Sequence, residues 1–268
     1  MVPLYVINME RSCDRWQSIK SHLVQHGLKP VRIPAVDGEK IEDAELVAMG
    51  VSLRTADRLI GGQRRHSFWM IDAKGAVGAT LSHTRAWEAL NSDANASYGV
   101  VLEDDAIIKA QDLSGAIANL TKSNLHGFDL VLLTSNAKIW DPFPGHSFNR
   151  TPDTNSVHAV TKDFWGGHGY CLSKRAASVL LQHAFPIEQH VENYIASLSR
   201  LSLLRVGVTS SVLIGLNPRW PSTISHGLPL FQVVLVFLAF LASIGIVIFI
   251  WRRRRRIGQG YGRGRGWA

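Results

Sequence analysis

The sequence predicts an α/β fold, and three apolar segments carry that prediction. Residues 4–7 and 30–36 read as strands, and a helical segment ending at Gly27 lies between them. Residues 98–105, Tyr-Gly-Val-Val-Leu-Glu-Asp-Asp, begin as a buried strand and end in adjacent acids. The strand–helix–strand order favours parallel pairing, because parallel strands need a crossover connection.

The remaining elements are expected in order along the chain. Further helices are expected over residues 41–49, 55–60, 74–87, 113–120, 174–183 and 186–199. Further strands are expected over residues 128–134 and 157–160 and at the end of the stretch 166–173. Residues 140–156 are rich in Pro, Asn, Asp and Ser and read as a long loop, either a functional lid or disordered.

Composition argues against a nucleic-acid partner. The formal net charge of the 268 residues is +8, but residues 252–268 hold seven arginines and no acid, which leaves the remainder at +1. Cys13 and Cys171 have neither metal-ligand spacing nor a disulfide framework, which fits a reducing compartment. The first eight residues lack the apolar core and basic leader of a signal peptide.

The segment 230–251 is expected to enter a membrane. Residues 233–250 are eighteen residues without a charge, close to the ~20 that span a bilayer, and Trp251 and five arginines follow. The nearest alternative is a very hydrophobic helix lying in the membrane interface. The Arg/Gly-rich tail 252–268 is expected to be disordered and to contact acidic lipid headgroups.

Two arguments about membrane topology conflict. The arginine block favours a cytosolic C-terminus, while nothing at the N-terminus would export the preceding domain. A monotopic insertion and a tail-anchored single span both keep residues 1–225 in the cytosol, and we expect that placement.

The acids Glu103, Asp104 and Asp105 are the main candidate site. Packed carboxylates repel one another and lose hydration, so a positive partner is expected. Oxygen ligands suit Mg²⁺ or Mn²⁺, which usually share their coordination shell with a substrate phosphate. The carboxyl end of a buried strand is also where open α/β sheets bind ligands. A solvated acidic turn after a strand would give the same pattern.

Basic and aromatic residues beside the acids leave two interpretations open. His83 shares a predicted helix face with Trp87, so it points either to the core or to a site. Arg11 and Arg15 could grip phosphate oxygens, or they could be ordinary surface charges of one helix.

Four motifs in a fixed order resemble glycosyltransferase family 25, the lipopolysaccharide (lipooligosaccharide) galactosyltransferase-like enzymes. They are Val-Ile-Asn-Met-Glu-Arg-Ser-Cys-Asp-Arg (6–15), Gly-Ala-Val-Gly-Ala-Thr-Leu-Ser-His (75–83), Val-Leu-Glu-Asp-Asp (101–105) and Gly-Gly-His-Gly-Tyr-Cys-Leu-Ser (166–173). The resemblance covers roughly residues 3–225.

The resemblance implies a GT-A-like, Rossmann-type nucleotide-sugar transferase domain. Its donor would be UDP-galactose, transferred with inversion to a glycan or glycolipid, with Mn²⁺ or Mg²⁺ on the diphosphate. Collagen hydroxylysine, an acceptor of related eukaryotic enzymes, is an alternative acceptor. Glu103-Asp104-Asp105 would take the place of the family's metal motif. The expected substrate-binding residues are Asn8, Arg11, Arg15, Asp37, Ser82, Gly167 and Tyr170.

Departures from the family pattern leave the catalytic base open. Pro186-Ile-Glu188 stands where the family typically reads Pro-x-Asp, and Gly167 stands where it often has Thr. A base must deprotonate the acceptor hydroxyl, and Glu188 and Asp153 are the carboxylate candidates. His83 and His168 are alternatives.

Two other functions compete with glycosyl transfer. An inactive membrane-bound binding module would have no reason to keep the strained acidic triplet. A metal-dependent phosphoesterase would need further His or Asp ligands at recognisable spacing, and the sequence shows none.

Overall fold

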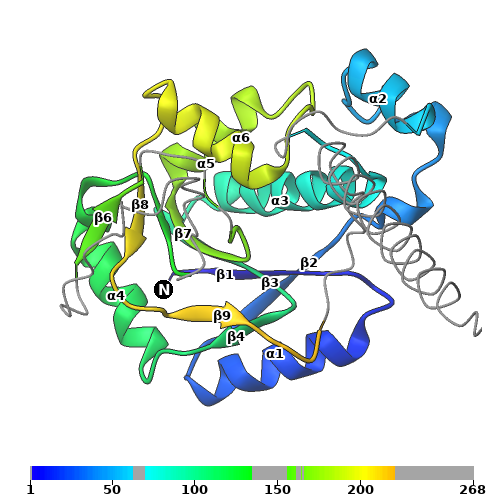
Figure 1. Cartoon of the computed structure of the whole chain (residues 1–268). Coiled ribbons are helices and arrows are strands. Elements are labelled where there is room, and N and C mark those ends of the chain that lie inside the picture. The colour runs from blue at the N-terminus through cyan, green and yellow to red at the C-terminus, as the bar shows by residue number, and fades with distance from the viewer. Residues whose placement is uncertain (1, 63–69, 135–155, 161–163, 165, 221–268) are drawn as a thin grey trace, which may run out of the picture. The chain divides into compact units, whose positions relative to one another are not determined.

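A central sheet with helices on both faces organises the chain (Figure 1). This computed structural model describes residues 2–62, 70–134, 156–160, 164 and 166–220. Within them, seven strands form one sheet in the order β2 (Pro30–Pro34), β1 (Leu4–Asn8), β3 (Tyr98–Glu103), β7 (Gly169–Ser173), β5 (Leu130–Leu132), β8 (Val206–Thr209) and β6 (Val157–Ala159). A two-stranded sheet pairs β4 (Ala106–Ile108) with β9 (Ile214–Leu216).

The sheet is mixed, and its parallel part creates the edge on which the site lies. β1 pairs in parallel with both β2 and β3, as the strand–helix–strand order predicted, whereas β7 runs antiparallel to β3 and β5. Ile7 lies opposite Glu103, so the chain leaves β1 and β3 at the same edge. The mixed sheet between helices confirms the α/β part of the predicted fold class and fits a Rossmann-like fold.

Two helical layers cover the sheet. Strand residues alternate between the layers, with Leu4 and Val6 in one apolar cluster and Tyr5 and Ile7 in the other. The first cluster packs beneath α1 (Cys13–Gln25) and α4 (Leu113–Lys122), and the second beneath α3 (Lys74–Ser92), α5 (Lys174–His183) and α6 (Val191–Arg200). Helix α1 ends where predicted, because Gly27 adopts a left-handed φ of 69°.

Close backbone contact holds the loop after β2 against α3. A Cβ atom at Gly78 would lie 2.6 Å from the carbonyl oxygen of Val36, so only glycine allows this approach. Ser82, one turn further along α3, accepts a hydrogen bond from the Val36 amide at 2.8 Å. Asp37 is therefore held over the first turns of α3, beside the edge where β1 and β3 end.

Two expected helices differ from the structure. Over 41–49 the chain forms only the 3₁₀ turn η2 (Asp43–Glu45), which follows the 3₁₀ turn η1 (Gly38–Lys40), and the next helix is α2 (Leu53–Ile60). Over 186–199 the helix begins at Val191, because the chain before it is extended and Ile187 forms a β-bridge with Val51. Strands β4, β8 and β9 and the short turn η3 (Asn124–Gly127) were not expected.

Several predictions fall on residues outside the described part of the chain. They include most of the loop 140–156, the membrane segment 230–251 and the tail 252–268. In the described ranges, no helix combines the length and apolarity required for a transmembrane span.

The close contact at Gly78 predicts whether replacing this glycine raises or lowers the stability of the fold. We expect Gly78→Ala to lower the free energy of unfolding by about 1–3 kcal/mol, as overpacking against rigid backbone does. Helix propensity alone would predict the opposite, a gain of up to about 1 kcal/mol. Thermal or urea unfolding measures the sign, and a more stable variant would show that α3 does not pack closely on this loop.

Candidate functional site

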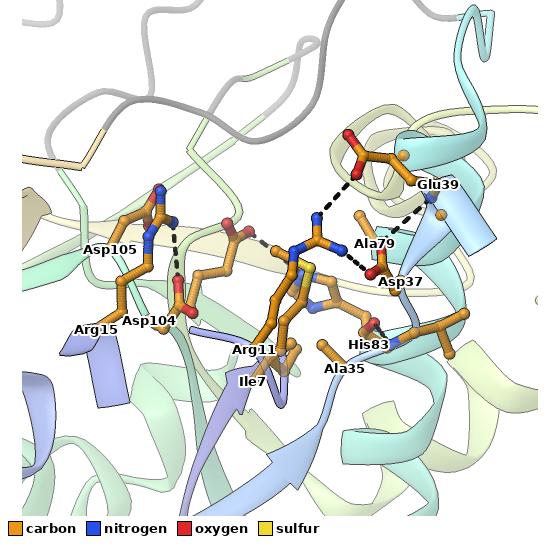
Figure 2. A pocket seen from close by; sticks show the side chains of 16 residues that line it. Ile7, Arg11, Arg15, Ala35, Asp37, Glu39, Ala79, His83, Asp104 and Asp105 are labelled. Atoms are coloured by element: carbon orange, nitrogen blue, oxygen red, sulfur yellow. Dashed lines mark hydrogen bonds and ion pairs between the residues drawn. The ribbon is translucent and has the colours of Figure 1, made fainter. Parts of the chain in front are cut away.

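A cavity opens where β1 and β3 end. Its volume is about 100 Å³, and its wall includes residues from both strand ends, the loop after β2 and one face of α3 (Figure 2). The described lining contains five carboxylates (Asp37, Glu39, Glu103, Asp104 and Asp105) and two guanidinium groups (Arg11 and Arg15). This excess of negative charge suits a cation, or an anion that brings a cation with it.

Within the triplet, Asp104 is the acid whose two carboxylate oxygens both accept hydrogen bonds from the protein. Asn8 donates to one carboxylate oxygen at 2.6 Å, and Arg15 donates to the other at 3.1 Å. Arg32 donates to the Asn8 side-chain oxygen at 2.8 Å, which fixes the amide so that its nitrogen faces Asp104. The predicted positive partner of the acidic cluster is therefore Arg15, and Asn8 and Arg15 hold Asp104 in place.

Asp105 has the opposite environment. Its Oδ1 atom is buried and has no hydrogen-bond partner among the described residues. Burial, followed by the charges of Glu103 and Asp104, raises the pKa of Asp105 to about 7. A buried carboxylate oxygen without a donor fits a ligand that brings positive charge.

Glu103 lies between these two cases. Its half-buried carboxylate contacts His83 Nε2 at a long 3.4 Å. Burial, followed by the charges of Glu192 and Asp104, raises the pKa of Glu103 to about 8. The three consecutive acids thus have three different surroundings.

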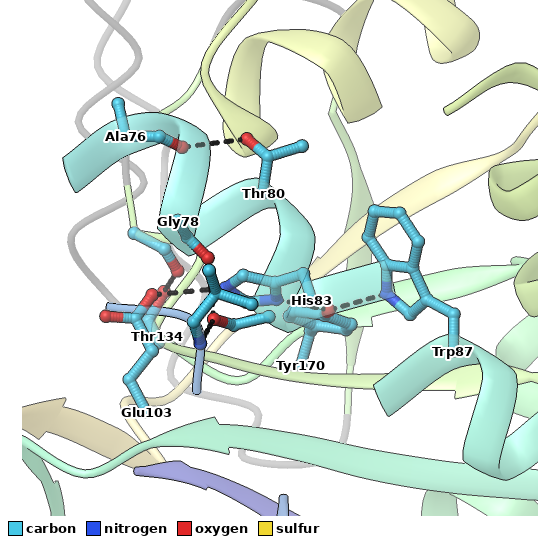
Figure 3. A network of polar contacts seen from close by, with 11 residues as sticks. Ala76, Gly78, Thr80, His83, Trp87, Glu103, Thr134 and Tyr170 are labelled. Atoms are coloured by element: carbon cyan, nitrogen blue, oxygen red, sulfur yellow. Dashed lines mark hydrogen bonds and ion pairs between the residues drawn. The ribbon is translucent and has the colours of Figure 1, made fainter. Parts of the chain in front are cut away.

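His83 belongs both to the core and to the site. Its side chain is 1% exposed, and its Nδ1 atom lies 2.8 Å from the Tyr170 hydroxyl, which also bonds Trp87 Nε1 at 2.8 Å (Figure 3). Burial lowers the pKa of His83 to about 4. His83 is therefore a neutral residue of the cavity wall, and Tyr170 lies behind it, away from the cavity.

Arg11 separates this cavity from a second one. It forms ion pairs with Asp37 and, at 3.3 Å, with Glu39 (Figure 2). The second cavity, about 330 Å³, shares Arg11 and Asp37 with the first and is also lined by Lys40 and Arg85. The two cavities could hold neighbouring parts of one extended ligand.

Ser82 lines the first cavity, but its hydroxyl is engaged by the fold. It accepts from the Val36 amide and donates to the Gly78 carbonyl oxygen at 2.6 Å. Ser82 therefore holds the loop that carries Asp37.

The structure does not bring the predicted base candidates together. Glu188 is exposed and does not line the described cavity, and its charge acts on Arg58. Asp153 lies outside the described residues. His168 is 4% exposed, its Nε2 atom has no partner among the described residues, and burial lowers its pKa to about 4.

Glu192 is an acid near the cavity that the sequence analysis did not single out. It lies in the first turn of α6 and packs over Gly167, where a Cβ atom would come within 2.9 Å of Glu192 Cγ. Its charge acts on Glu103 and His83. The sequence analysis considered Glu188 at the Pro-x-Asp position, which lies in the extended stretch before α6, whereas Glu192 lies within the helix.

The described residues alone do not complete a metal-coordination shell at this site. Within the described residues, no three His, Cys, Asp or Glu side chains converge as metal ligands. Asp105 has a free oxygen, whereas both oxygens of Asp104 already accept hydrogen bonds. Such a donor set fits an ion held by one or two carboxylates, with substrate phosphates completing its shell.

The contrast between Asp104 and Asp105 predicts opposite effects of the same change. We expect Asp104→Asn to lower the free energy of unfolding by about 3 kcal/mol, because it breaks a buried ion pair and turns an amide group towards a donor. Asp105→Asn should leave stability unchanged or raise it, since it removes a buried charge. Urea unfolding of both variants without added metal tests this, and equal losses would contradict the assignment.

Known proteins provide an independent comparison. The chain is 25% identical over 180 residues to "Putative glycosyltransferase R655" of Acanthamoeba polyphaga mimivirus, covering 65% of this chain and 50% of that protein. It is 31% identical over 102 residues to a "Glycosyltransferase 25 family member" of Anopheles gambiae, covering 38% of this chain and 16% of that protein. A protein of the same description from Drosophila pseudoobscura pseudoobscura is 24% identical over 192 residues, covering 69% of this chain and 28% of that protein. The chain thus spans half or less of the length of these relatives.

Solved structures are more distant. A197 from STIV matches with a TM-score of 0.42 and 11% identity over 84% of this chain and 99% of that one. Apo UDP-glucose pyrophosphorylase matches with a TM-score of 0.38 and 10% identity over 78% of this chain and 90% of that one. At these values neither structure adds to the functional argument.

The family comparison is decisive. The model of the family described as "Glycosyltransferase family 25 (LPS biosynthesis protein)" matches residues 1–195, which include the ends of β1 and β3, α3 and the Gly167–Glu192 contact. The predicted resemblance is therefore confirmed, and the chain belongs to glycosyltransferase family 25.

Proposed function

We propose that this glycosyltransferase moves a hexose from a UDP-sugar to a glycan or glycolipid acceptor, with a divalent ion bound at Asp105. The observation that carries the proposal is the buried, unpartnered oxygen of Asp105 at the edge where β1 and β3 end. Galactose is the proposed sugar and a lipopolysaccharide-type glycan the proposed acceptor. Both rest on family membership, as do inversion and the GT-A class.

Charge in the cavity supports a metal-assisted donor site. A nucleoside diphosphate is an anion, and the described wall already carries more carboxylates than guanidinium groups. Mn²⁺ or Mg²⁺ at Asp105 would stabilise the charge that develops on the departing diphosphate. Asp104 stays bound to Asn8 and Arg15 and keeps the neighbouring carboxylate in register.

Arg11 is placed to exchange one anionic partner for another. About half-exposed, it pairs with Asp37 and Glu39 on the wall shared by the two cavities. A guanidinium binds phosphate oxygens through two parallel hydrogen bonds. A donor with its nucleoside in one cavity and its diphosphate in the other would therefore pass directly beside Arg11.

Glu192 is the carboxylate we propose as the base for the acceptor hydroxyl. It lies over Gly167 next to Glu103, and no hydrogen bond or ion pair to a described residue occupies its carboxylate. Glu192 lies in the first turn of α6, which fixes the direction from which its side chain approaches Gly167. His83 is less suited, since both of its ring nitrogens are engaged.

A donor screen tests the overall proposal. The full-length chain should hydrolyse or transfer from UDP-hexoses only with Mn²⁺ or Mg²⁺ present. We expect Asp105→Asn to lower kcat by at least ~10²-fold, similar to removing a preorganised electrostatic group. Asp112→Asn is the matched control, because Asn caps the start of α4 as well as Asp does. Normal turnover and metal dependence in Asp105→Asn would refute the metal assignment.

Glu192 and Glu188 allow a paired test of the base. We expect Glu192→Gln to lower kcat by about 10²-fold or more, with a small change in the donor KM, since general-base catalysis contributes about 10²–10⁴-fold. Glu188→Gln should have nearly normal kinetics, because Glu188 is exposed outside the described cavity. The reverse pattern in steady-state assays would return the role of base to Glu188.

A further inference from the structure

A hydrogen-bond chain connects the aromatic core to the cavity wall. It runs from Trp87 Nε1 to the Tyr170 hydroxyl (2.8 Å), on to His83 Nδ1 (2.8 Å), and from His83 Nε2 to Glu103 Oε1 (3.4 Å) (Figure 3). Trp87 and Tyr170 are fully buried, so no solvent replaces a missing partner. The direction of each bond then follows from the donors and acceptors available.

The indole of Trp87 fixes which group donates in each hydrogen bond of this chain. An indole N–H can only donate, so the Tyr170 oxygen accepts from Trp87. The hydroxyl proton of Tyr170 then needs an acceptor, and His83 Nδ1 is its other partner among the described residues. A neutral imidazole carries its proton on the nitrogen that does not accept. The proton of His83 therefore lies on Nε2, facing Glu103.

The opposite tautomer would leave a buried hydroxyl proton without an acceptor. With the proton on Nδ1, the Tyr170 hydroxyl proton would have no acceptor in the described part of the chain, and buried polar groups rarely stay unpaired. Because Nδ1 accepts the Tyr170 proton, it carries no proton of its own, and the same geometry excludes the imidazolium.

We propose that Tyr170 is a positioning residue: it holds His83 as the Nε2–H tautomer, and His83 in turn orients the Glu103 carboxylate at the cavity wall. The tautomer itself follows from the fold, and its importance for transfer rests on the proposed function. A partner behind a site residue commonly changes activity by about 10–100-fold when removed.

Nitrogen NMR of the full-length chain labelled with ¹⁵N-histidine tests the tautomer. The His83 signals are assigned by their loss in His83→Gln. At neutral pH we expect a bare, pyridine-like Nδ1 and a protonated, pyrrole-like Nε2. A protonated Nδ1, or an imidazolium with both nitrogens protonated, would overturn the proposal without reference to any enzymatic assay.

Tyr170→Phe tests the positioning role, with Tyr194→Phe as the matched control. Tyr194 also contacts the Trp87 ring, but its hydroxyl donates to the Leu180 carbonyl oxygen and has no bond to His83. Tyr170→Phe removes the hydrogen-bond donor to Nδ1, so it should move the His83 Nδ1 signal and lower kcat about 10-fold or more, with a smaller change in donor KM. Tyr194→Phe should keep the wild-type His83 signals.

Three outcomes separate this inference from the proposed function. Unchanged His83 signals in Tyr170→Phe would overturn the positioning role. If Tyr170→Phe does not fold, the wild-type spectrum still decides the tautomer. If no UDP-sugar supports transfer while the Nε2–H tautomer is seen, the proposed function fails and the tautomer stands.

Discussion

The hydrogen bonds that Asn8 and Arg15 donate to Asp104 are the constraint on which the site depends. They tie the end of β1 and the first turns of α1 to the end of β3, across the parallel pairing of the two strands. Without these donors, three adjacent carboxylates would repel one another, and each would also lose hydration without gaining a partner. With them, one acid is neutralised inside the protein and its neighbours are left to face a ligand.

This division explains how the acidic triplet can be buried. Asp104 is held by hydrogen bonds within the protein, and Glu103 contacts the His83 imidazole. Asp105 has one buried oxygen without a partner among the described residues. A site built only of paired carboxylates would have no affinity for a cation, and a site built only of unpaired ones would destabilise the fold. The arrangement lies between those limits.

Local pattern was enough to predict the parts of the fold that build this edge. The apolar runs of β1 and β3 and the glycine-containing start of α3 all formed the expected elements. Glu103, Asp104 and Asp105 were placed correctly at a strand end because periodicity and charge agree there. The sequence left open whether His83 lies in the core or in the site, and both are true. Its Nδ1 atom contacts buried Tyr170, and its Nε2 atom contacts Glu103 at the cavity wall.

Long-range contacts decided what the sequence could not. The bridge between Ile187 and Val51 keeps the preceding residues extended, so the helix expected from Pro186 begins only at Val191. The pairing of Asp104 with Asn8 and Arg15 likewise joins residues that lie far apart in the sequence. No local window contains both partners of such a contact.

The packing of Glu192 over Gly167 restricts how this site can diverge. A side chain at 167 and a long acid at 192 would occupy the same volume, because the missing Cβ is what lets the glutamate approach. A relative with threonine at the first position therefore needs a shorter acid or a displaced helix at the second. The two positions should vary together, and exchanging one alone would either expel the carboxylate from the site or separate α6 from the sheet.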